Sequence, residues 1–585
     1  MDEKTLLTRA FSQFQLAALG LILLTVVTRL PSLLHPWSID DESVYSIVAN
    51  EIVDGGRPYI DAVERKPPLL FWLYAGIIEV TGKFNPTGLH AVAVAWTLAT
   101  MAGLYVIGRQ LFDRGTGLVA ALLYSVYQPW GTFKDLAFNG ELIMNLPLVW
   151  ACAIVFARSP AKLRPELLVA GALLCVAFLL KQPAAIAAIP FGIYLLLPSY
   201  RASRGLTPTA SAFHAFLLTV GFFGMLGLVA AVLQRQGILR EAFFWTITNH
   251  ANPHIFWGKG ALSTLAFLAC CFPLVIGAVM SLRDKRGLWT ENSAERIALL
   301  ALLAASAIGA AAGARFYPHY YIQLIPALAL LAAPYYARIW SRKDQPGHWL
   351  LRLATSYAVL AVTVAAFFVL SYFGLLPQRE ASEPGSYLSK NSAPNERIFV
   401  WGHAPWIYME AQRRPACRYI LTYPLTGRVF GGRLPGVDTS KWIIPGAWNI
   451  LEQDFRKHPP VYIVDLEHGP EGRYPVRNFP VLTRLLENSY QPVLQATWGV
   501  IYRLRPATQT PMSLAQLPDQ QCVGPNFGVR NLLYRRDANA VRANGARPPG
   551  AIGKKIEWLL PMTSSIGHAP DLETQSGFRA LAMAD

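Results

Sequence analysis

Residues 36–72, which begin Pro-Trp-Ser-Ile-Asp-Asp-Glu-Ser-Val-Tyr and end Arg-Lys-Pro-Pro-Leu-Leu-Phe-Trp, are the most informative stretch of this chain. They directly follow an apolar run, residues 14–34, that is long enough to cross a membrane. Three consecutive carboxylates occupy positions 40–42, and a proline-stiffened basic turn contains Lys66. Acidic side chains beside a membrane are costly unless they have a function or a partner. The stretch therefore predicts a polar loop of a membrane protein that can accept a proton and hold an anion.

The composition is that of an integral membrane protein. Of the 585 residues, 53% are hydrophobic and 15% are charged, and the mean hydropathy is +0.31. Soluble domains carry about 25% charged residues. A net charge of +16 could suit nucleic acid, but the lysines and arginines lie in the loops between apolar runs, as the positive-inside rule requires. We therefore expect the lipid bilayer as a partner and no nucleic acid.

Apolar runs of membrane-spanning length predict a polytopic α-helical protein with about 11 spans, in a range of about 11–13. The runs are residues 14–34, 87–108, 115–131, 141–157, 167–180, 183–198, 214–233, 261–280, 297–313, 320–336 and 353–375. Lysine and arginine are richer in the segments that lie inside if the N-terminus is cytoplasmic. We expect a multi-pass protein of the inner (plasma) membrane, with the acidic loop and a C-terminal domain on the periplasmic or extracytoplasmic side.

The sequence pattern changes near residue 376. Beyond it, short apolar strings at 397–402, 461–465 and 498–504 alternate with helical patterns, which predicts a small α/β domain. The predicted division is a transmembrane domain over 1–376, with a first outer loop at 35–86, then an extracytoplasmic α/β domain over 377–506 and an irregular tail over 507–585.

Two helices are expected within the first outer loop. Val44, Ile47, Val48 and Ile52 recur with helical spacing and leave polar residues on the opposite face. This pattern predicts an amphipathic helix on the membrane surface, with the acids in its first turn. A second interfacial helix would begin at Pro67-Pro68 and present aromatic side chains to the interface.

Other polar residues lie in the predicted outer segments. The acids could serve only as a helix cap, and Lys66 could be a lysine that extends to the interface. Residues 315–321, Arg-Phe-Tyr-Pro-His-Tyr-Tyr, could bind phosphate oxygens or form an aromatic belt with one cation. Glu141 opens a helix and could cap it. For Lys-Gln-Pro at 181–183, a cation in a tight hairpin, a structural role is the favoured interpretation.

The order of these motifs resembles a known family. Asp-Glu-x-x-Tyr at 41–45, followed by Lys-Pro-Pro-Leu-x-x-Trp at 66–72, is similar to the membrane glycosyltransferases of the GT-C class that use polyprenyl-phosphate sugars. Protein O-mannosyltransferases and lipid A aminoarabinose transferases are relatives of this kind. The strings at 181–183 and 317–320 also fall where bacterial members resemble this chain, and the similarity covers about 10–375. The resemblance implies a GT-C-like transmembrane domain.

The resemblance also implies roles for individual residues. Asp41 would be the general base with Glu42 beside it as a second catalytic carboxylate, and Lys66 and Tyr320 would hold the donor phosphate. The further substrate-binding candidates are Arg315, His319, Tyr45 and Glu141. Asn50 stands where the aminoarabinose-transferase pattern has a basic residue. Arg315 or His319 would then take that place.

The implied reaction is transfer of a hexose or pentose from a polyprenyl-phosphate donor to an acceptor hydroxyl of a cell-envelope lipid such as lipopolysaccharide, a glycan or a protein. Inversion is expected because no second carboxylate is assigned as nucleophile, although Glu42 leaves retention open. No cofactor is required and no metal ligand is assigned, while a divalent metal is possible at the acids. The alternative is a transporter or flippase of a lipid-linked or small polar substrate. Transporters usually place charges at midplane within internal repeats, which the sequence does not show.

Overall fold

The computed structural model describes residues 3–34, 40–130, 133–158, 164–250, 255–284, 289–341, 382–428, 438–466 and 474–506. The chain divides into two compact units. The first contains Met1–Arg397 and Ala404–Ile420, and the second contains Ile398–His403 and the described residues from Leu421 onward. The predicted span at 353–375 and the tail at 507–585 lie outside the described residues.

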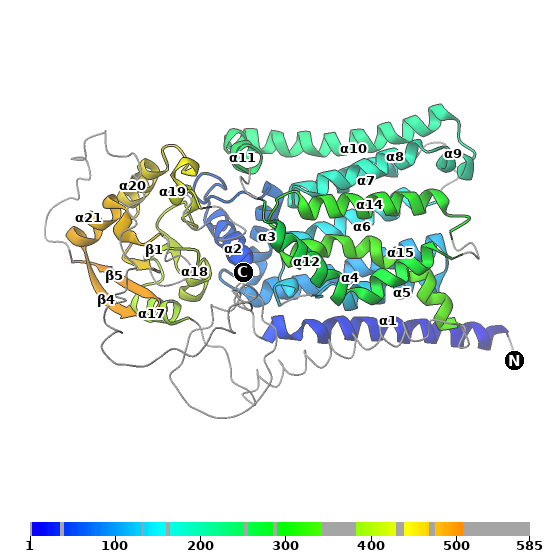
Figure 1. The fold of residues 1–585 in the computed structure, drawn as a ribbon, viewed down its shortest axis with the longest axis horizontal. Helices are drawn as coiled ribbons and strands as arrows, with labels where there is room; N and C mark the ends of the chain where they lie inside the picture. Colours follow the sequence, from blue (N-terminus) through cyan, green and yellow to red (C-terminus); the bar gives the residue numbers. More distant parts are fainter. Residues whose placement is uncertain are drawn as a thin grey trace, which may run out of the picture. The chain divides into compact units, whose positions relative to one another are not determined.

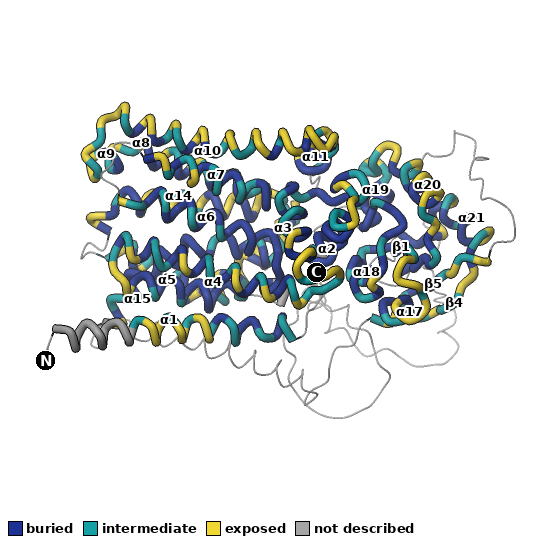
Figure 2. The backbone as a smooth tube through the Cα atoms, turned by 180° about the vertical axis from the view of Figure 1, so that it is seen from behind, coloured by how far each residue is buried: buried dark blue, intermediate teal, exposed yellow. Residues whose placement is uncertain are grey.

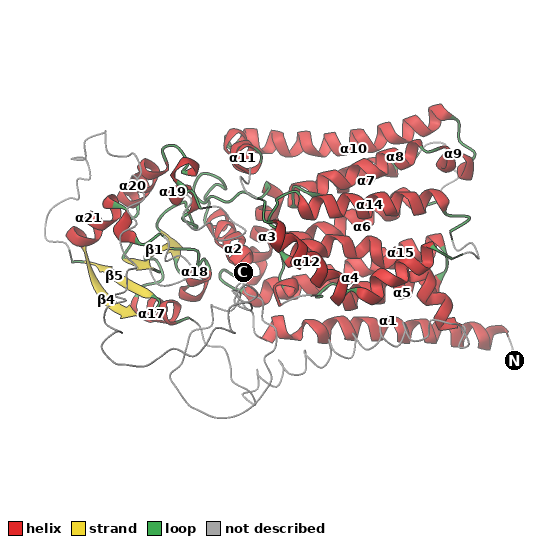
Figure 3. Ribbon diagram, viewed as in Figure 1, coloured by secondary structure: helices red, strands yellow, loops and turns green. Residues whose placement is uncertain are grey.

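The first unit is a bundle of apolar helices (Figure 1 and Figure 3). Its α-helices are α1 (Glu3–Leu34), α2 (Asp40–Val53), α3 (Pro68–Thr81), α4 (Pro86–Leu111), α5 (Arg114–Tyr127), α6 (Gly140–Phe156), α7 (Glu166–Leu180), α8 (Ala184–Leu196), α9 (Pro198–Arg204), α10 (Pro208–Arg235), α11 (Leu239–Thr246), α12 (Trp257–Cys270), α13 (Phe272–Leu282), α14 (Ser293–Ala311), α15 (Ile325–Ser341), α17 (Glu383–Asn391) and α18 (Trp406–Ala411). Short 3₁₀ helices are η1 (Phe133–Leu136), η2 (Thr248–His250) and η3 (Pro318–Leu324), and the two-residue strand β2 is Arg414–Pro415.

The described helices make this a multi-pass membrane protein. Five of them are long and apolar enough to cross a bilayer, and bent helix pairs raise the number to at most seven. The run at 261–280, expected as one span, is divided into α12 and α13, which are bent by 75°. On α10, Phe223 and Leu228 are each 61% exposed, as expected of a helix whose surroundings are lipid. The helices α3, α6 and α7 are apolar but shorter, so the span number of about 11 stays a prediction.

The helix α2 differs from the surface helix that the sequence pattern predicted. Both of its faces are buried, since Val48 is 0% exposed and Glu51 on the polar face only 3% (Figure 2). Glu51 accepts a hydrogen bond of 2.6 Å from Arg414 and lies 3.5 Å from Arg397. A local pattern cannot reveal such distant partners, and for that reason the polar face was assigned to the membrane surface.

The helix α3 was likewise expected to present its aromatic residues to the membrane interface. Instead, Phe71 and Tyr74 are completely buried in the first unit. The Tyr74 hydroxyl donates a hydrogen bond to the carbonyl of Phe138. The helices α2 and α3 therefore form part of the protein interior rather than a flat surface layer.

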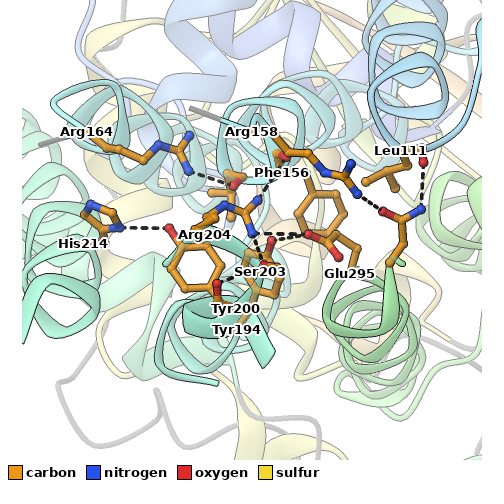
Figure 4. A network of polar contacts seen from close by, with 12 residues as sticks. Leu111, Phe156, Arg158, Arg164, Tyr194, Tyr200, Ser203, Arg204, His214 and Glu295 are labelled. Carbon is orange, nitrogen blue, oxygen red and sulfur yellow. Dashed lines mark hydrogen bonds and ion pairs between the residues drawn. The ribbon is translucent and has the colours of Figure 1, made fainter. Parts of the chain in front are cut away.

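At the opposite end of the bundle from α2, buried polar side chains join several helices (Figure 1 and Figure 4). Arg204, the last residue of α9, lies 3.5 Å from Glu295 of α14 and donates to the last carbonyl of α6 at 3.4 Å. Tyr194 of α8 donates to Glu295 at 2.8 Å. The guanidinium of Arg204 also lies 4.4 Å from the ring centroid of Tyr200, whose hydroxyl contacts His214 of α10 at 2.9 Å. These contacts, here called the inner-end network, fix the helix ends relative to one another.

The second unit is built on a sheet in the order β1-β3-β5-β4 (Figure 3). The strands are β1 (Arg397–Trp401), β3 (Tyr462–Asp465), β4 (Tyr490–Ala496) and β5 (Gly499–Leu504), and the helices are α19 (Tyr423–Thr426), α20 (Ala447–Lys457), α21 (Pro480–Ser489), η4 (Ser440–Trp442) and η5 (Val476–Asn478). β1 and β3 are parallel, with Phe399 opposite Ile463, whereas β5 is antiparallel to β3 and β4. Phe399 packs on Phe455 of α20 at 5.0 Å. The predicted α/β character of this part of the chain is confirmed.

Candidate active site

The two acids at the start of α2 lie in different surroundings. The Asp41 side chain is 46% exposed, whereas that of Glu42 is 2% exposed. One oxygen of Glu42 lies 2.9 Å from Nε2 of His90, and the other accepts a hydrogen bond of 3.1 Å from the backbone N–H of Phe138. Asp41 is therefore the acid of this pair that a substrate can reach.

His319 lies between two carboxylates. Its Nε2 is 3.7 Å from Oδ2 of Asp41 and 4.0 Å from Oε1 of Glu141. Glu141 is 0% exposed in the first turn of α6. The N-cap of this helix is Asn139, whose side chain accepts from the N–H of Leu142 at 3.1 Å. Glu141 is thus free of the capping role that was an alternative for it, and it faces the same histidine as Asp41.

Lys181 completes this group of charges. It forms a buried ion pair with Glu141, and its Nζ lies 4.8 Å from the ring centroid of Tyr320. A Cβ atom at Gly140 would lie 2.7 Å from the Lys181 side chain, so glycine leaves the space that the lysine occupies. The favoured interpretation of Lys181 was a structural role in a hairpin. The structure brings it instead to the predicted site residues, and the Lys-Gln-Pro string was the signal that could have found it.

Lys66 lies beside Tyr45, with its Nζ 5.8 Å from the ring centroid. The Tyr59 hydroxyl donates to the Lys66 carbonyl at 2.7 Å and so holds the backbone of the basic turn. Burial lowers the pKa of Lys66, the nearby Asp41 carboxylate opposes this effect, and Lys181 adds to it. Burial also raises the pKa of Tyr45, and the charge of Asp41 adds to the increase. The phenol therefore keeps its proton, and the charge of Asp41 acts on both Tyr45 and Lys66.

Arg315 approaches from the segment after α14. It is 8% exposed and stands between Ala314 and Phe316, whose φ angles of 53° and 51° lie in the left-handed region. Such conformations cost about 1 kcal/mol or more per residue and are concentrated at functional sites. Burial lowers the pKa of Arg315, and the positive charge of Arg65 lowers it further. Two buried arginines thus act on each other near the lysines of the site.

The arrangement can remove a proton and hold an anion. A series of close contacts runs from Asp41 through His319, Glu141 and Lys181 to Tyr320. The charges of Lys66 and Asp41 also act on each other. The donors are a buried ammonium, a guanidinium and phenols, which are suited to phosphate oxygens. Within the described ranges, no group of three or more His, Cys, Asp or Glu residues could hold a metal ion.

Comparison with known proteins gives a family for part of the chain and a fold for most of it. Residues 65–226 match the sequence model of the dolichyl-phosphate-mannose-protein mannosyltransferase family. The structure of ArnT from Cupriavidus metallidurans bound to undecaprenyl phosphate matches with a TM-score of 0.51 and 15% identity, over 85% of this chain and 98% of that one. The chain has the GT-C glycosyltransferase fold.

A second structural match is the archaeal oligosaccharyltransferase AglB from Archaeoglobus fulgidus, in complex with an inhibitory peptide and a dolichol-phosphate. It has a TM-score of 0.44 and 13% identity, over 86% of this chain and 75% of AglB. Among curated proteins the sequence finds no match. The predicted GT-C fold class is confirmed by ArnT, and the family match at 65–226 contains Lys66, Glu141 and Lys181.

Proposed function

We propose that this GT-C protein is an inverting glycosyltransferase that moves a sugar from a polyprenyl-phosphate donor to an acceptor hydroxyl. The observation that carries the proposal is the half-exposed carboxylate of Asp41 in one group of charges with the buried Lys181 and with Lys66. The match to a dolichyl-phosphate-mannose-dependent family and the lipid phosphate bound to ArnT support a lipid-phosphate donor. The acceptor is a lipid, glycan or protein of the cell envelope.

In the proposed reaction Asp41 takes the proton of the acceptor hydroxyl. The resulting oxygen attacks the anomeric carbon from the face opposite the phosphate, and the bond between that carbon and the phosphate oxygen breaks. Both electrons of the broken bond remain on the phosphate, whose negative charge increases. Lys66, Tyr320 and Arg315 stabilise this charge, because preorganised donors act most strongly where charge develops.

A single displacement inverts the configuration of the anomeric carbon. Retention would need a second carboxylate as nucleophile. Glu42 is the carboxylate that the sequence suggested for this role, but both of its oxygens are occupied by His90 and the N–H of Phe138. The product anomer is therefore expected to be the opposite of the donor anomer.

The proposed steps need no cofactor. A divalent cation at the acids would add positive charge near the leaving phosphate, which is a role that the lysines already serve. We propose that the site faces the outer side of the inner membrane, with the N-terminus in the cytoplasm, because the predicted inner segments of the transmembrane domain are richer in lysine and arginine than its outer segments. Transfer rates with and without a chelator measure any metal requirement.

The test is to incubate the purified protein with a panel of hexosyl and pentosyl polyprenyl phosphates and an envelope extract, and to measure released polyprenyl phosphate. Asp41→Asn should lower the rate about 10²–10⁴-fold, while folding stays intact because this side chain is half exposed. NMR of the product gives the anomer. Transbilayer movement of an intact donor in proteoliposomes, without any released polyprenyl phosphate, would establish the transporter alternative instead.

A further inference from the structure

We infer that Glu42 and His90 form a buried pair that positions Asp41, so that Glu42 is a positioning residue and not a second catalytic carboxylate. The inference rests on the proposed function, in which Asp41 is the base. Both side chains are 2% exposed. At this burial neither side chain is open to a substrate that arrives from solvent, so the pair has to act through the groups that it holds.

The hydrogen bonds of the pair define where its protons lie. Nδ1 of His90 contacts the carbonyl of Ser32 in α1, and a carbonyl can only accept, so Nδ1 carries a hydrogen. Nε2 then faces Oε2 of Glu42 at 2.9 Å, and one shared proton lies between them. The remaining oxygen, Oε1, accepts from the N–H of Phe138. Every polar atom of the pair is satisfied, as buried polar groups require.

These contacts connect the first turn of α2 to the rest of the site. Phe138 precedes Asn139, the N-cap of α6, and α6 carries Glu141 in its first turn. The carbonyl of Phe138 in turn accepts from Tyr74 of α3. One carboxylate thus links α2 to α1, α4 and the segment that starts α6, and it fixes the position of Asp41 relative to Glu141.

The position of the preceding residue follows from this anchor. Successive side chains of a helix are about 100° apart, so holding Glu42 toward α4 directs Asp41 to another side. There its carboxylate lies 3.7 Å from His319. Catalysis by a base depends on this kind of placement, because an error of about 1 Å can cost roughly 10²-fold in rate.

Substitution by glutamine separates positioning from catalysis. In Glu42→Gln, the amide oxygen can accept from Phe138 and the amide nitrogen can donate to Nε2 of neutral His90, so the geometry is retained without a charge. We expect kcat of Glu42→Gln to stay within about tenfold of wild type. Glu42→Ala and His90→Ala should each lose about 10²-fold in kcat with little change in donor KM. The double alanine variant should be no slower than either single one, because both remove the same pair.

A matched control is His214→Ala. His214 is also a buried histidine, and it contacts the Tyr200 hydroxyl at 2.9 Å, but it belongs to the inner-end network. Its loss should destabilise the protein to a similar degree while kcat of the folded fraction stays near wild type. If the alanine variants do not fold, the kcat values of Glu42→Gln and His90→Gln still test whether the pair positions Asp41, because each glutamine can keep a hydrogen bond within the pair.

Two results would overturn the inference. If the Glu42→Gln variant were as inactive as the Asp41→Asn variant, Glu42 would be a catalytic group. Normal kcat in the folded fraction of Glu42→Ala would reduce the pair to a structural contact. A wild-type protein without any transfer, or an active Asp41→Asn variant, would instead count against the proposed function, so the two failures are distinguishable.

Discussion

The ion pair between Lys181 and Glu141 gives the sharpest test of how the site is assembled. Lys181→Ala would leave Glu141, which is 0% exposed, with the imidazole of His319 at 4.0 Å in place of an ammonium partner. The other oxygen of Glu141 already has no hydrogen-bond partner among the described residues. Removal of one partner from a buried ion pair costs about 3–5 kcal/mol. We expect a loss of this size in the free energy of unfolding.

The assay is reversible unfolding in mixed detergent micelles, with Lys83→Ala as the matched control. Lys83 pairs with Asp54 where the side chains are 37% and 22% exposed, and an exposed pair is worth less than about 1 kcal/mol. The double variant Lys181→Met/Glu141→Gln should recover about 1–3 kcal/mol relative to the sum of the single losses. Equal losses of unfolding free energy in Lys181→Ala and Lys83→Ala would refute the buried ion pair between Lys181 and Glu141. Strictly additive losses in the double variant would refute it as well.

The remaining predictions concern the donor phosphate, the topology and pH. Lys66→Ala should weaken donor binding and also slow the chemical step, and Tyr320→Phe should cost about 1.5–3 kcal/mol of transition-state stabilisation; additive effects in the double variant would contradict a shared phosphate. In a cysteine-free background, Arg57→Cys and Gln491→Cys, both exposed, should react with an impermeant thiol reagent in spheroplasts, and labelling only after permeabilisation would reverse the topology. Burial raises the pKa of Asp465 to about 6, whereas the pKa of an aspartate in the unfolded chain is about 4. The protonated carboxyl therefore stabilises the folded state fully below about pH 4, and this stabilisation, at most about 3 kcal/mol, is lost as pH rises through about 6. The protection of β3 amides, which is the exchange rate relative to the intrinsic rate at each pH, should fall over that pH range in wild type and not in Asp465→Asn. Constant protection in wild type would exclude this linkage.

Most of the fold was predictable because its signals are local. Apolar runs predicted the membrane helices, and the strings around Phe399, Ile463 and Ile501 predicted three strands of the sheet. β4 was not predicted, because Pro492 and the irregular pairing between Pro492 and Leu494 interrupt its alternation. The bend between α12 and α13 was also not predicted, although Pro273 at the start of α13 is a residue type that interrupts helices and was the available signal.

Only those candidate site residues that belong to a recognisable sequence motif were predictable. The acid string and the basic turn indicated Asp41 and Lys66, and the resemblance indicated Tyr320 and His319. The partners of these residues depend on contacts across long stretches of chain. His90 is separated by 48 positions from Glu42, and it lies inside an apolar helix without any motif around it. Sequence reasoning therefore proposed which groups react but gave no indication of what holds them in place.

The inner-end network bears on how the protein meets bilayers of different thickness. Helices usually adapt to a hydrophobic mismatch by tilting or by shifting along one another. Here α6, α8 and α14 are joined at one end through Arg204, Glu295 and Tyr194, so one of them cannot shift without breaking buried bonds of the others. A mismatch would be taken up by tilt of the whole bundle or by the lipid. The spacing of Glu141, Lys181 and His319 at the opposite end would then be independent of the membrane around them.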